Sequence, residues 1–325
     1  MLDVLIIGCG NIAGGFDAER RGTSAPFTHA GAYQAHGGYN LAACVEPDAN
    51  RRTAFQQRWG VTQAFARIEE ACTSQARYDV VSICSPTFHH AEDLCAVLAL
   101  KPALVFCEKP LTASLAKSLD LAARYRDAGI SLMVNYTRRW DERLRTLAAE
   151  LAHGEWGRVR SVSGVYNKGL YNNGSHMLDL LTLLLGPLTV LAAGPGNADM
   201  WEDDHSIPAL LLSDAGVPVT LNCGHAADYV LFEFELVTER GTVKMENGGL
   251  DWQIRRAGPS PVFTGYQALG APQHQPGTIG GAALAAVHEI ASILATGSKP
   301  SCTANDAVAV QALCDVIRTA SRKYS

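Results

Sequence analysis

A glycine-rich turn near the start of the chain has the spacing of a dinucleotide-binding loop. An apolar run at residues 4–7 leads directly into Gly8-Cys9-Gly10-Asn11-Ile12-Ala13, a G-x-G-x-x-A pattern. The first glycine of such a loop makes the tight turn, the second admits a pyrophosphate, and a small third residue lets the helix pack on the strand. Amides at the start of that helix then bind phosphate. The pattern therefore predicts a bound dinucleotide cofactor.

The acidic residue expected at the cofactor ribose is Glu46, which ends the second apolar run. It lies 36 residues after Gly10, whereas the usual interval is about 20, and residues 15–27 are interpreted as an inserted loop beside the cofactor. A carboxylate accepts hydrogen bonds from ribose hydroxyls and repels a 2′-phosphate, so NAD is favoured over NADP, although Arg51 and Arg52 weaken this preference. The alternative role for Glu46 is a charge at a helix N-terminus.

Two polar sequences follow buried apolar runs further along the chain. Ser85-Pro86-Thr87-Phe88-His89-His90 follows residues 79–84, and Glu108-Lys109-Pro110 follows residues 103–107. Ligands of open α/β sheets bind beyond the carboxyl ends of the strands. We therefore expect Ser85, Pro86 and His90 at the cofactor, and Lys109 at its nicotinamide end. The alternative for Lys109 is a solvated lysine in a loop.

The elements that position these residues follow from the hydrophobic periodicity. The first half alternates short apolar runs with helical patterns, which is typical of a parallel sheet with crossover helices. A doubly wound Rossmann domain is predicted over residues 1–134. Its expected strands are 4–7, 41–45, 79–84, 103–107 and 132–135, and its expected helices are 48–59, capped by Asp48 and stopped at Gly60, 90–100 and 114–128.

The second half contains several strand patterns with little helix between them, which predicts a mainly antiparallel sheet. An α+β domain is therefore expected over residues 135–325. Residues 256–281, rich in Gly, Pro and Gln, are interpreted as a long mobile or functional loop. The expected strands are 160–167, 217–223, 230–238, 242–246 and 252–255, and the expected helices are 141–152, 175–185, 282–295 and 305–322.

Composition excludes several classes of protein. With 325 residues, 47% hydrophobic, and a net charge of −5, the chain has neither the composition of a disordered protein nor a nucleic-acid footprint. The opening lacks a basic region, and the longest apolar stretch, 180–193, is interrupted and short, so neither a signal peptide nor a membrane span is expected. Nine cysteines without a C-x-x-C pair favour a reducing, cytoplasmic compartment. The histidines lack metal-ligand spacing, so no metal is expected.

Several motifs resemble those of the Gfo/Idh/MocA oxidoreductases, which act on sugars and cyclitols with NAD(P). They are the opening glycine loop, S-P-T-F-H-H at 85–90, C-E-K-P-L-T at 107–112, V-N-Y-T-R-R-W at 134–140 and N-N-G-S-H-M-L-D-L-L at 172–181. The resemblance implies a Rossmann domain followed by an open-faced antiparallel sheet that carries substrate contacts. It also implies a homodimer or homotetramer.

The resemblance matches Lys109 to the family's E-K-P lysine and His176 to its site histidine. Dehydrogenation removes a hydride and a hydroxyl proton, and Lys109 is the expected base, because desolvation and the nicotinamide charge lower an ammonium pKa. Glu108 is expected to orient Lys109 or a ribose hydroxyl. His176 is expected in the first turn of a helix, where the dipole disfavours the imidazolium.

Other polar residues are expected to line the substrate pocket. Many family members have aspartate where this chain has Asn172, and asparagine cannot take up a proton at neutral pH. Asp179 either contacts substrate or forms a packing hydrogen bond, and Arg139 and Lys168 either bind an anionic substrate group or pair with a structural acid. The expected pocket residues are Tyr136, Arg139, Lys168, Asn172, Asn173 and Asp179.

Three functions are compatible with these residues. The favoured one is an NAD-dependent oxidoreductase acting on a sugar, a nucleotide-sugar or a cyclitol. The second is an enzyme with tightly held NAD that oxidises its substrate transiently to permit elimination or hydrolysis. The third is a non-catalytic NAD or sugar sensor, which Asn172 favours and the presence of Lys109 and His176 disfavours.

Overall fold

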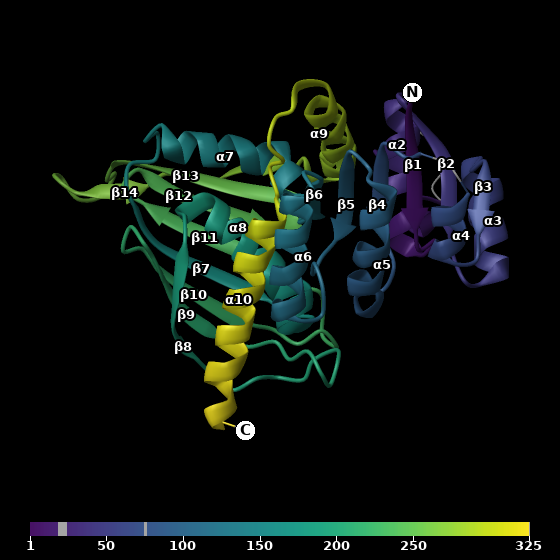
Figure 1. Ribbon diagram of the computed structural model, residues 1–325. Helices are drawn as coiled ribbons and strands as arrows, with labels where there is room; N and C mark the ends of the chain where they lie inside the picture. The colour runs from purple at the N-terminus through teal and green to yellow at the C-terminus, as the bar shows by residue number, and fades with distance from the viewer. Residues whose placement is uncertain (19–24, 75–76, 325) are drawn as a thin grey trace. The chain divides into compact units, whose positions relative to one another are not determined.

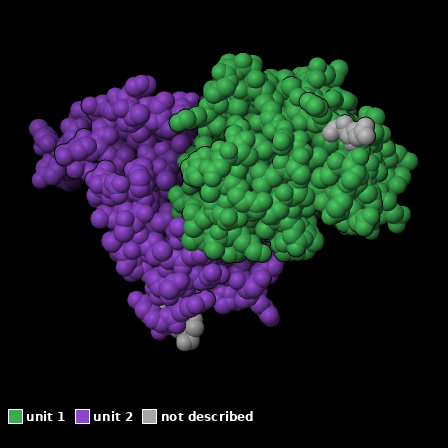
Figure 2. Space-filling view, in the orientation of Figure 1, with its two compact units in different colours: residues 1–140, 280–309 green, residues 141–279, 310–325 purple. Residues whose placement is uncertain are grey.

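The computed structural model describes residues 1–18, 25–74 and 77–324, and these form two compact units (Figures 1 and 2). Unit 1 comprises residues 1–140 and 280–309, and unit 2 comprises residues 141–279 and 310–325. The first boundary follows Trp140 instead of residue 134. Residues 280–309 belong to unit 1, although we expected them in the second domain. The chain returns there because the backbone N–H of Val134 donates to the Cys302 carbonyl at 3.1 Å.

Unit 1 is built on a six-stranded parallel sheet in the order β3-β2-β1-β4-β5-β6, which confirms the Rossmann prediction. Every residue of β4 is buried, as expected for a parallel strand covered on both faces. β3 was not predicted, because it has three residues and begins with a glutamine. The strands are β1 (Leu2–Ile7), β2 (Tyr39–Val45), β3 (Gln63–Phe65), β4 (Val80–Ile83), β5 (Leu104–Glu108) and β6 (Ser131–Asn135).

The helices of unit 1 begin and end where local signals place them. The Asp48 side chain accepts a hydrogen bond from the Arg51 amide at 2.7 Å, and Gly60 ends the same helix with a φ of +64°. The expected helix between these residues is thus confirmed. The helices are α1 (Phe16–Ala18), α2 (His29–His36), α3 (Ala49–Trp59), α4 (Ile68–Thr73), α5 (Thr87–Leu100), α6 (Leu115–Asp127) and α9 (Ala282–Thr296), with short helical turns η1 (Asn11–Gly15) and η2 (Thr137–Trp140).

One helical stretch of the described chain, Ile279–Thr296, is long and apolar enough by length and composition to cross a membrane. Most of it is α9, which packs within unit 1. The Tyr39 hydroxyl donates to the Val287 carbonyl at 2.8 Å, and the Trp140 indole N–H donates to Glu289, also at 2.8 Å. These hydrogen bonds attach α9 to Tyr39 of β2 and to Trp140 of η2.

Unit 2 is built on a nine-stranded, mainly antiparallel sheet in the order β14-β13-β12-β11-β7-β10-β9-β8, with β15 also paired to β13, and this confirms the predicted fold class. β7 and β10 form its parallel pair. The strands are β7 (Val159–Tyr166), β8 (Leu188–Ala193), β9 (Ala209–Ser213), β10 (Pro218–Cys223), β11 (Phe232–Thr238), β12 (Gly241–Glu246), β13 (Asp251–Pro259), β14 (Gln267–Leu269) and β15 (Gln273–Pro276).

The prediction of a long loop at 256–281 is wrong in part. β13 continues to Pro259, and β14 and β15 both pair with it. The remaining helical elements are α7 (Glu142–Ala152), η3 (Gly169–Gly174), α8 (Ser175–Leu185) and α10 (Ala304–Ser321), with short turns η4 (Asn247–Gly249), η5 (Ile279–Gly281) and η6 (Arg322–Tyr324).

One face of the unit 2 sheet is covered. Val162, Gly164 and Tyr166 alternate with more exposed residues along β7, and a Cβ at Gly164 would lie 3.3 Å from the sulfur of Met177 on α8. Alternation with period two is the pattern of a strand with one buried face. The helix α8 therefore packs directly against the sheet.

Candidate functional site

The glycine loop of unit 1 has the shape that a dinucleotide requires. Gly8 has a φ of +84°, and a Cβ there would lie 2.6 Å from the backbone nitrogen of Ser85, so only glycine fits. A Cβ at Gly10 would meet no atom within 4 Å, so this position faces open space. Ala13 is fully buried. The surroundings of the three small residues thus agree with the separate roles that the sequence pattern predicts.

Glu46 joins the glycine loop to the end of β2. It is 5% exposed, and its Oε2 accepts a hydrogen bond from the Cys9 amide at 3.0 Å. Its Oε1 accepts from the Asp48 amide at 3.1 Å and from Arg51 at 3.4 Å. The cap of α3 is Asp48 itself, so Glu46 is more than a helix-terminal charge. It holds the loop in place and presents a carboxylate beside it.

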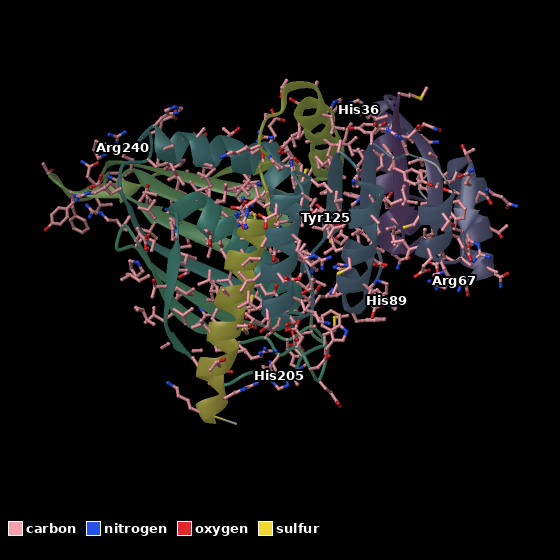
Figure 3. The ribbon with its side chains drawn as sticks, viewed as in Figure 1. His36, Arg67, His89, Tyr125, His205 and Arg240 are labelled. Carbon is pink, nitrogen blue, oxygen red and sulfur yellow. The ribbon has the colours of Figure 1, made fainter. Side chains whose placement is uncertain are left out.

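A cavity of about 410 Å³ lies next to this loop. His89 at the start of α5 and Arg67 before α4, both labelled in Figure 3, belong to its wall. It is therefore formed at the carboxyl ends of β1, β2 and β4, where open α/β sheets bind ligands. Its lining includes Gly8, Glu46, Arg51, Arg67, Ser85, Pro86, His89 and Asp93.

Two residues of this region, His90 and Ser85, have hydrogen-bond partners within the protein. His90 does not line the cavity in the described part of the chain. Its ring nitrogens each lie 2.9 Å from a backbone carbonyl, of Ser85 and of Pro110, so it ties two loops together. The Ser85 hydroxyl donates to Asp93 at 2.5 Å. Burial raises the pKa of Asp93, although the Ser85 hydrogen bond opposes this shift.

Glu108 lies at the end of β5, directly beside Asn135 of β6 in the sheet register. The Asn135 amide donates to its Oε1 at 2.6 Å, and His29 Nε2 lies 2.9 Å from the same oxygen. Burial alone would raise the pKa of Glu108, but the hydrogen bonds from His29 and Asn135 and the charge of Lys109 hold it below its ordinary value. Lys109 follows β5 and is half-buried, so it is not a freely solvated loop lysine.

Tyr136 and Arg139 occupy buried positions in unit 1. Tyr136 is almost completely buried just after β6. The Arg139 guanidinium donates to the Ser301 carbonyl at 2.7 Å and lies 3.4 Å from Asp306. Pairing with a structural acid was one of the two roles considered for Arg139, and the structure contains that pair.

The predicted residues of unit 2 gather on one helical run. The π-helical turn η3 continues directly into α8, and it includes Asn172 and Asn173, while His176 and Asp179 lie on α8. His176 therefore lies in the first turn of α8, as expected, and the π-helical turn that begins at Gly169 leads directly into this turn. π-Helical turns of this kind are frequent at functional sites.

The start of this run is held by backbone hydrogen bonds. Lys168 has a φ of +64°, and its amide donates to Asp199 at 2.6 Å. The Asn172 amide side chain donates to the Lys168 carbonyl at 3.1 Å, and its backbone N–H donates to Asp204 at 2.9 Å. A side-chain N–H is thus used at position 172, which an aspartate could not supply. Asp179 is buried and His176 half-buried.

Some site residues were not predicted from the sequence. His29 and Asn135 form hydrogen bonds with Glu108, and Ser82 contacts His29. His89 and Asp93 line the cavity. His89 and Asn135 lie inside motifs that were identified, but nothing in their spacing shows which side chain points inward. The inserted loop expected at 15–27 lies partly outside the described residues. Its described part begins as helix, and Asp17 accepts from the Thr28 amide at 2.9 Å.

The arrangement in unit 1 fits a dinucleotide. Gly10 leaves open space at the helix start, Gly8 allows the loop to touch Ser85, and Glu46 places hydrogen-bond acceptors at the cavity. Among residues 1–18, 25–74 and 77–324, no group of three His, Cys, Asp or Glu side chains is placed to hold a metal ion. All nine cysteines are free thiols.

Comparison with known proteins agrees with this fit. Residues 2–136 match the Gfo/Idh/MocA model, described as an oxidoreductase family with an NAD-binding Rossmann fold. D-apiose dehydrogenase from Paraburkholderia graminis is 26% identical over 61% of this chain and 57% of its own length. Inositol 2-dehydrogenase from Corynebacterium glutamicum is 33% identical over 40% of this chain and 38% of its own length. The matched segments thus span about half the length of these relatives or less.

The fold of the whole chain is also found among solved structures. Levoglucosan dehydrogenase in complex with NADH and levoglucosan aligns with a TM-score of 0.80, covering 100% of this chain and 98% of that one. The sequence identity is 19%. Both units therefore have the architecture of known dehydrogenase structures.

Proposed function

Since the chain belongs to the Gfo/Idh/MocA family of oxidoreductases, we propose that it is an NAD-dependent dehydrogenase acting on a CH–OH group of a sugar, a nucleotide-sugar or a cyclitol. The observation that carries the proposal is the glycine loop, in which Gly8 packs against Ser85 and Gly10 is open beside a cavity lined by Glu46. The relatives are named as dehydrogenases of D-apiose and of inositol, which supports a polyhydroxylated substrate.

NAD, when bound, supplies the hydride acceptor. The loop from Gly8 to Ala13 binds the pyrophosphate with its backbone, and Glu46 accepts hydrogen bonds from the adenosine ribose. Arg51 lies 3.4 Å from the Glu46 carboxylate and offsets part of its charge. Because Glu46 is buried and Arg51 is mostly exposed, the carboxylate dominates, and the site prefers NAD to NADP.

Lys109 takes the hydroxyl proton of the substrate. Its Nζ must be neutral to act as base, which requires a pKa near the working pH. Glu108, fixed by His29 and Asn135, keeps a negative charge close to this lysine and so limits how far its pKa can fall. The family resemblance assigns His176 of α8 a hydrogen bond to the substrate.

A panel of free sugars, nucleotide-sugars and cyclitols tests the proposal. Each compound is mixed with the protein and NAD, and formation of NADH is measured by its absorbance. A net increase in NADH with at least one compound, abolished in Lys109→Ala, is the expected result. Cofactor that copurifies with the protein and shows no net absorbance change while substrate is consumed would instead identify a transient oxidation. Binding without any turnover would identify a sensor.

We further propose that unit 2 mediates self-association, as a homodimer or homotetramer. Leu210 on β9 and Val237 on β11 are 39% and 40% exposed, while Leu211 and Leu236 next to them in the chain are buried. Since neighbouring residues of a strand point to opposite faces, the apolar side chains lie on the face that unit 2 leaves open. A second copy of the chain can bury such a surface.

A further inference from the structure

A line of hydrogen bonds runs through the core of unit 1 to Glu108. The Tyr33 hydroxyl on α2 lies 2.8 Å from Ser82 Oγ on β4, and Ser82 Oγ lies 3.2 Å from His29 Nδ1. His29 Nε2 lies 2.9 Å from Glu108 Oε1, which also accepts from Asn135 at 2.6 Å. Tyr33, Ser82 and His29 are buried, so these groups have one another in place of water.

The direction of each hydrogen bond follows from the buried end of the line. Burial raises the pKa of Tyr33, so its hydroxyl keeps its proton, and the hydrogen-bond acceptor it has among the described residues is Ser82. Tyr33 therefore donates to Ser82, and Ser82 donates its own proton to His29 Nδ1. The His29 proton must then be on Nε2, from which it is donated to Glu108.

The line of hydrogen bonds ends at the Glu108 carboxylate. Two N–H donors converge on its Oε1, which favours the ionised carboxylate in spite of burial. Both donors use the same oxygen, so Oε2 is left for other partners. Lys109 follows Glu108 directly in the chain after β5, and the charge of Lys109 lowers the pKa of the Glu108 carboxyl.

We infer that His29 is a positioning residue for Lys109: it holds the Glu108 carboxylate ionised and in one place beside the lysine that acts as base. The role of Lys109 as base in this inference rests on the proposed function, whereas the contacts of His29 and Glu108 do not depend on it. Loss of His29 leaves the buried carboxylate with one donor fewer. The carboxylate then takes up a proton or moves away, and either change removes negative charge from the surroundings of Lys109.

The titration of Lys109 can be measured without a substrate. The full-length protein is labelled with acetic anhydride across a range of pH, and the Lys109 peptide is quantified by mass spectrometry against the exposed Lys101. An opposite charge within about 4–6 Å typically shifts a pKa by about 1–3 units. We therefore expect Glu108→Gln to lower the apparent pKa of Lys109 by about one unit, and His29→Leu to lower it by about half a unit.

The double variant tests whether His29 acts through Glu108. If it does, His29→Leu has no further effect on Lys109 when Glu108 is already glutamine. His29→Gln, which retains an N–H donor, should restore the wild-type titration. The matched control is His36→Leu on the same helix, a residue labelled in Figure 3 that contacts His288 and not Glu108, and it should leave Lys109 unchanged.

Several results would overturn the inference. An unchanged Lys109 titration in His29→Leu, or an additive effect in the double variant, would show that His29 does not act through the carboxylate. If His29→Leu fails to fold, Ser82→Ala is the second variant, because it removes the hydrogen-bond donor to His29 Nδ1. This variant should also lower the apparent pKa of Lys109. An unchanged pKa of Lys109 in Ser82→Ala would contradict the inference equally. If the apparent pKa of Lys109 falls in His29→Leu but the wild-type protein turns over no compound of the panel, the proposed function is refuted and the link between His29 and Lys109 still holds.

Discussion

Replacement of Glu46 by glutamine tests the choice of cofactor most directly. The glutamine has nearly the same shape and removes one negative charge from the wall of the cavity. Its single carbonyl oxygen cannot accept from both the Cys9 and the Asp48 amides, which lie 3.0 and 3.1 Å from the two carboxylate oxygens. One backbone N–H therefore loses its acceptor, at a cost of about 1–3 kcal/mol. The affinity for NADH itself is expected to fall somewhat.

The ratio of the two affinities isolates the electrostatic effect. Two unit charges about 4 Å apart interact by about 1 kcal/mol in water and about 4 kcal/mol at an effective dielectric constant of about 20. A 2′-phosphate carries almost two charges, and Glu46 is buried, but Arg51 lies 3.4 Å away and its side chain is 57% exposed. We take a net repulsion of about 1.4–2.8 kcal/mol, which corresponds to a change of about 10- to 100-fold in the ratio of the NADPH and NADH dissociation constants.

The assay is fluorescence titration of NADH and NADPH, which needs no substrate. Wild-type protein should bind NADH more tightly, and Glu46→Gln should narrow the difference by the factor above. Glu69→Gln is the control, because Glu69 lines the same cavity but is exposed and screened. Tighter NADPH binding by wild-type protein, or an unchanged ratio in Glu46→Gln, would refute the reasoning.

The other predictions concern catalysis, assembly and stability. Lys109→Ala should lower kcat by about 10²–10⁴ with nearly unchanged NADH affinity, measured by steady-state kinetics and titration, and full turnover would refute its role as base. Asn172→Asp loses the donor to the Lys168 carbonyl and should lower the thermal midpoint without raising kcat, and higher activity would show that a proton relay was missing. Light scattering at micromolar concentration should give a dimer or tetramer, whereas a strict monomer contradicts the open-face argument. Burial and the nearby His288 lower the pKa of His36, so the folded state binds fewer protons and the free energy of unfolding should fall as pH drops below about 6.5. Urea titrations of wild type and His36→Gln check this, and equal pH dependence in both would contradict it.

Local signals predicted most of the fold. The helix from Ala49 to Trp59 was identified by its cap and its terminal glycine, which act within one turn of the backbone. β3, β8 and β9 were not identified, because strands of this kind are stabilised by distant partners. β3, for example, pairs with β2 at Cys44 and Ala64. The hairpin strands after Pro259 were assigned to a loop for the same reason, since glycine and proline content says nothing about pairing.

The site residues divide in the same way. Gly8, Glu46 and Lys109 were predicted because each is adjacent to the end of an apolar strand, where parallel sheets bind ligands. His176 lies in the first turn of α8 as predicted, whereas the π-helical turn from Gly169 was not predicted, because it carries no sequence signature that separates it from a loop. His90 was assigned to the cofactor, but its ring lies between two carbonyl groups.

The network around Glu108 could not be predicted, because its members are far apart in the chain. His29 lies 53 residues from Ser82 and 79 from Glu108. The strand order β1-β4-β5-β6 places Ser82, Glu108 and Asn135 on successive strands, so that each contributes one polar side chain to an otherwise apolar layer. In a low-dielectric core, each of these groups is costly without the others, and the complete set is strongly held. The sequence therefore reveals the carboxylate beside the lysine, whereas the folded core determines that the carboxylate stays ionised.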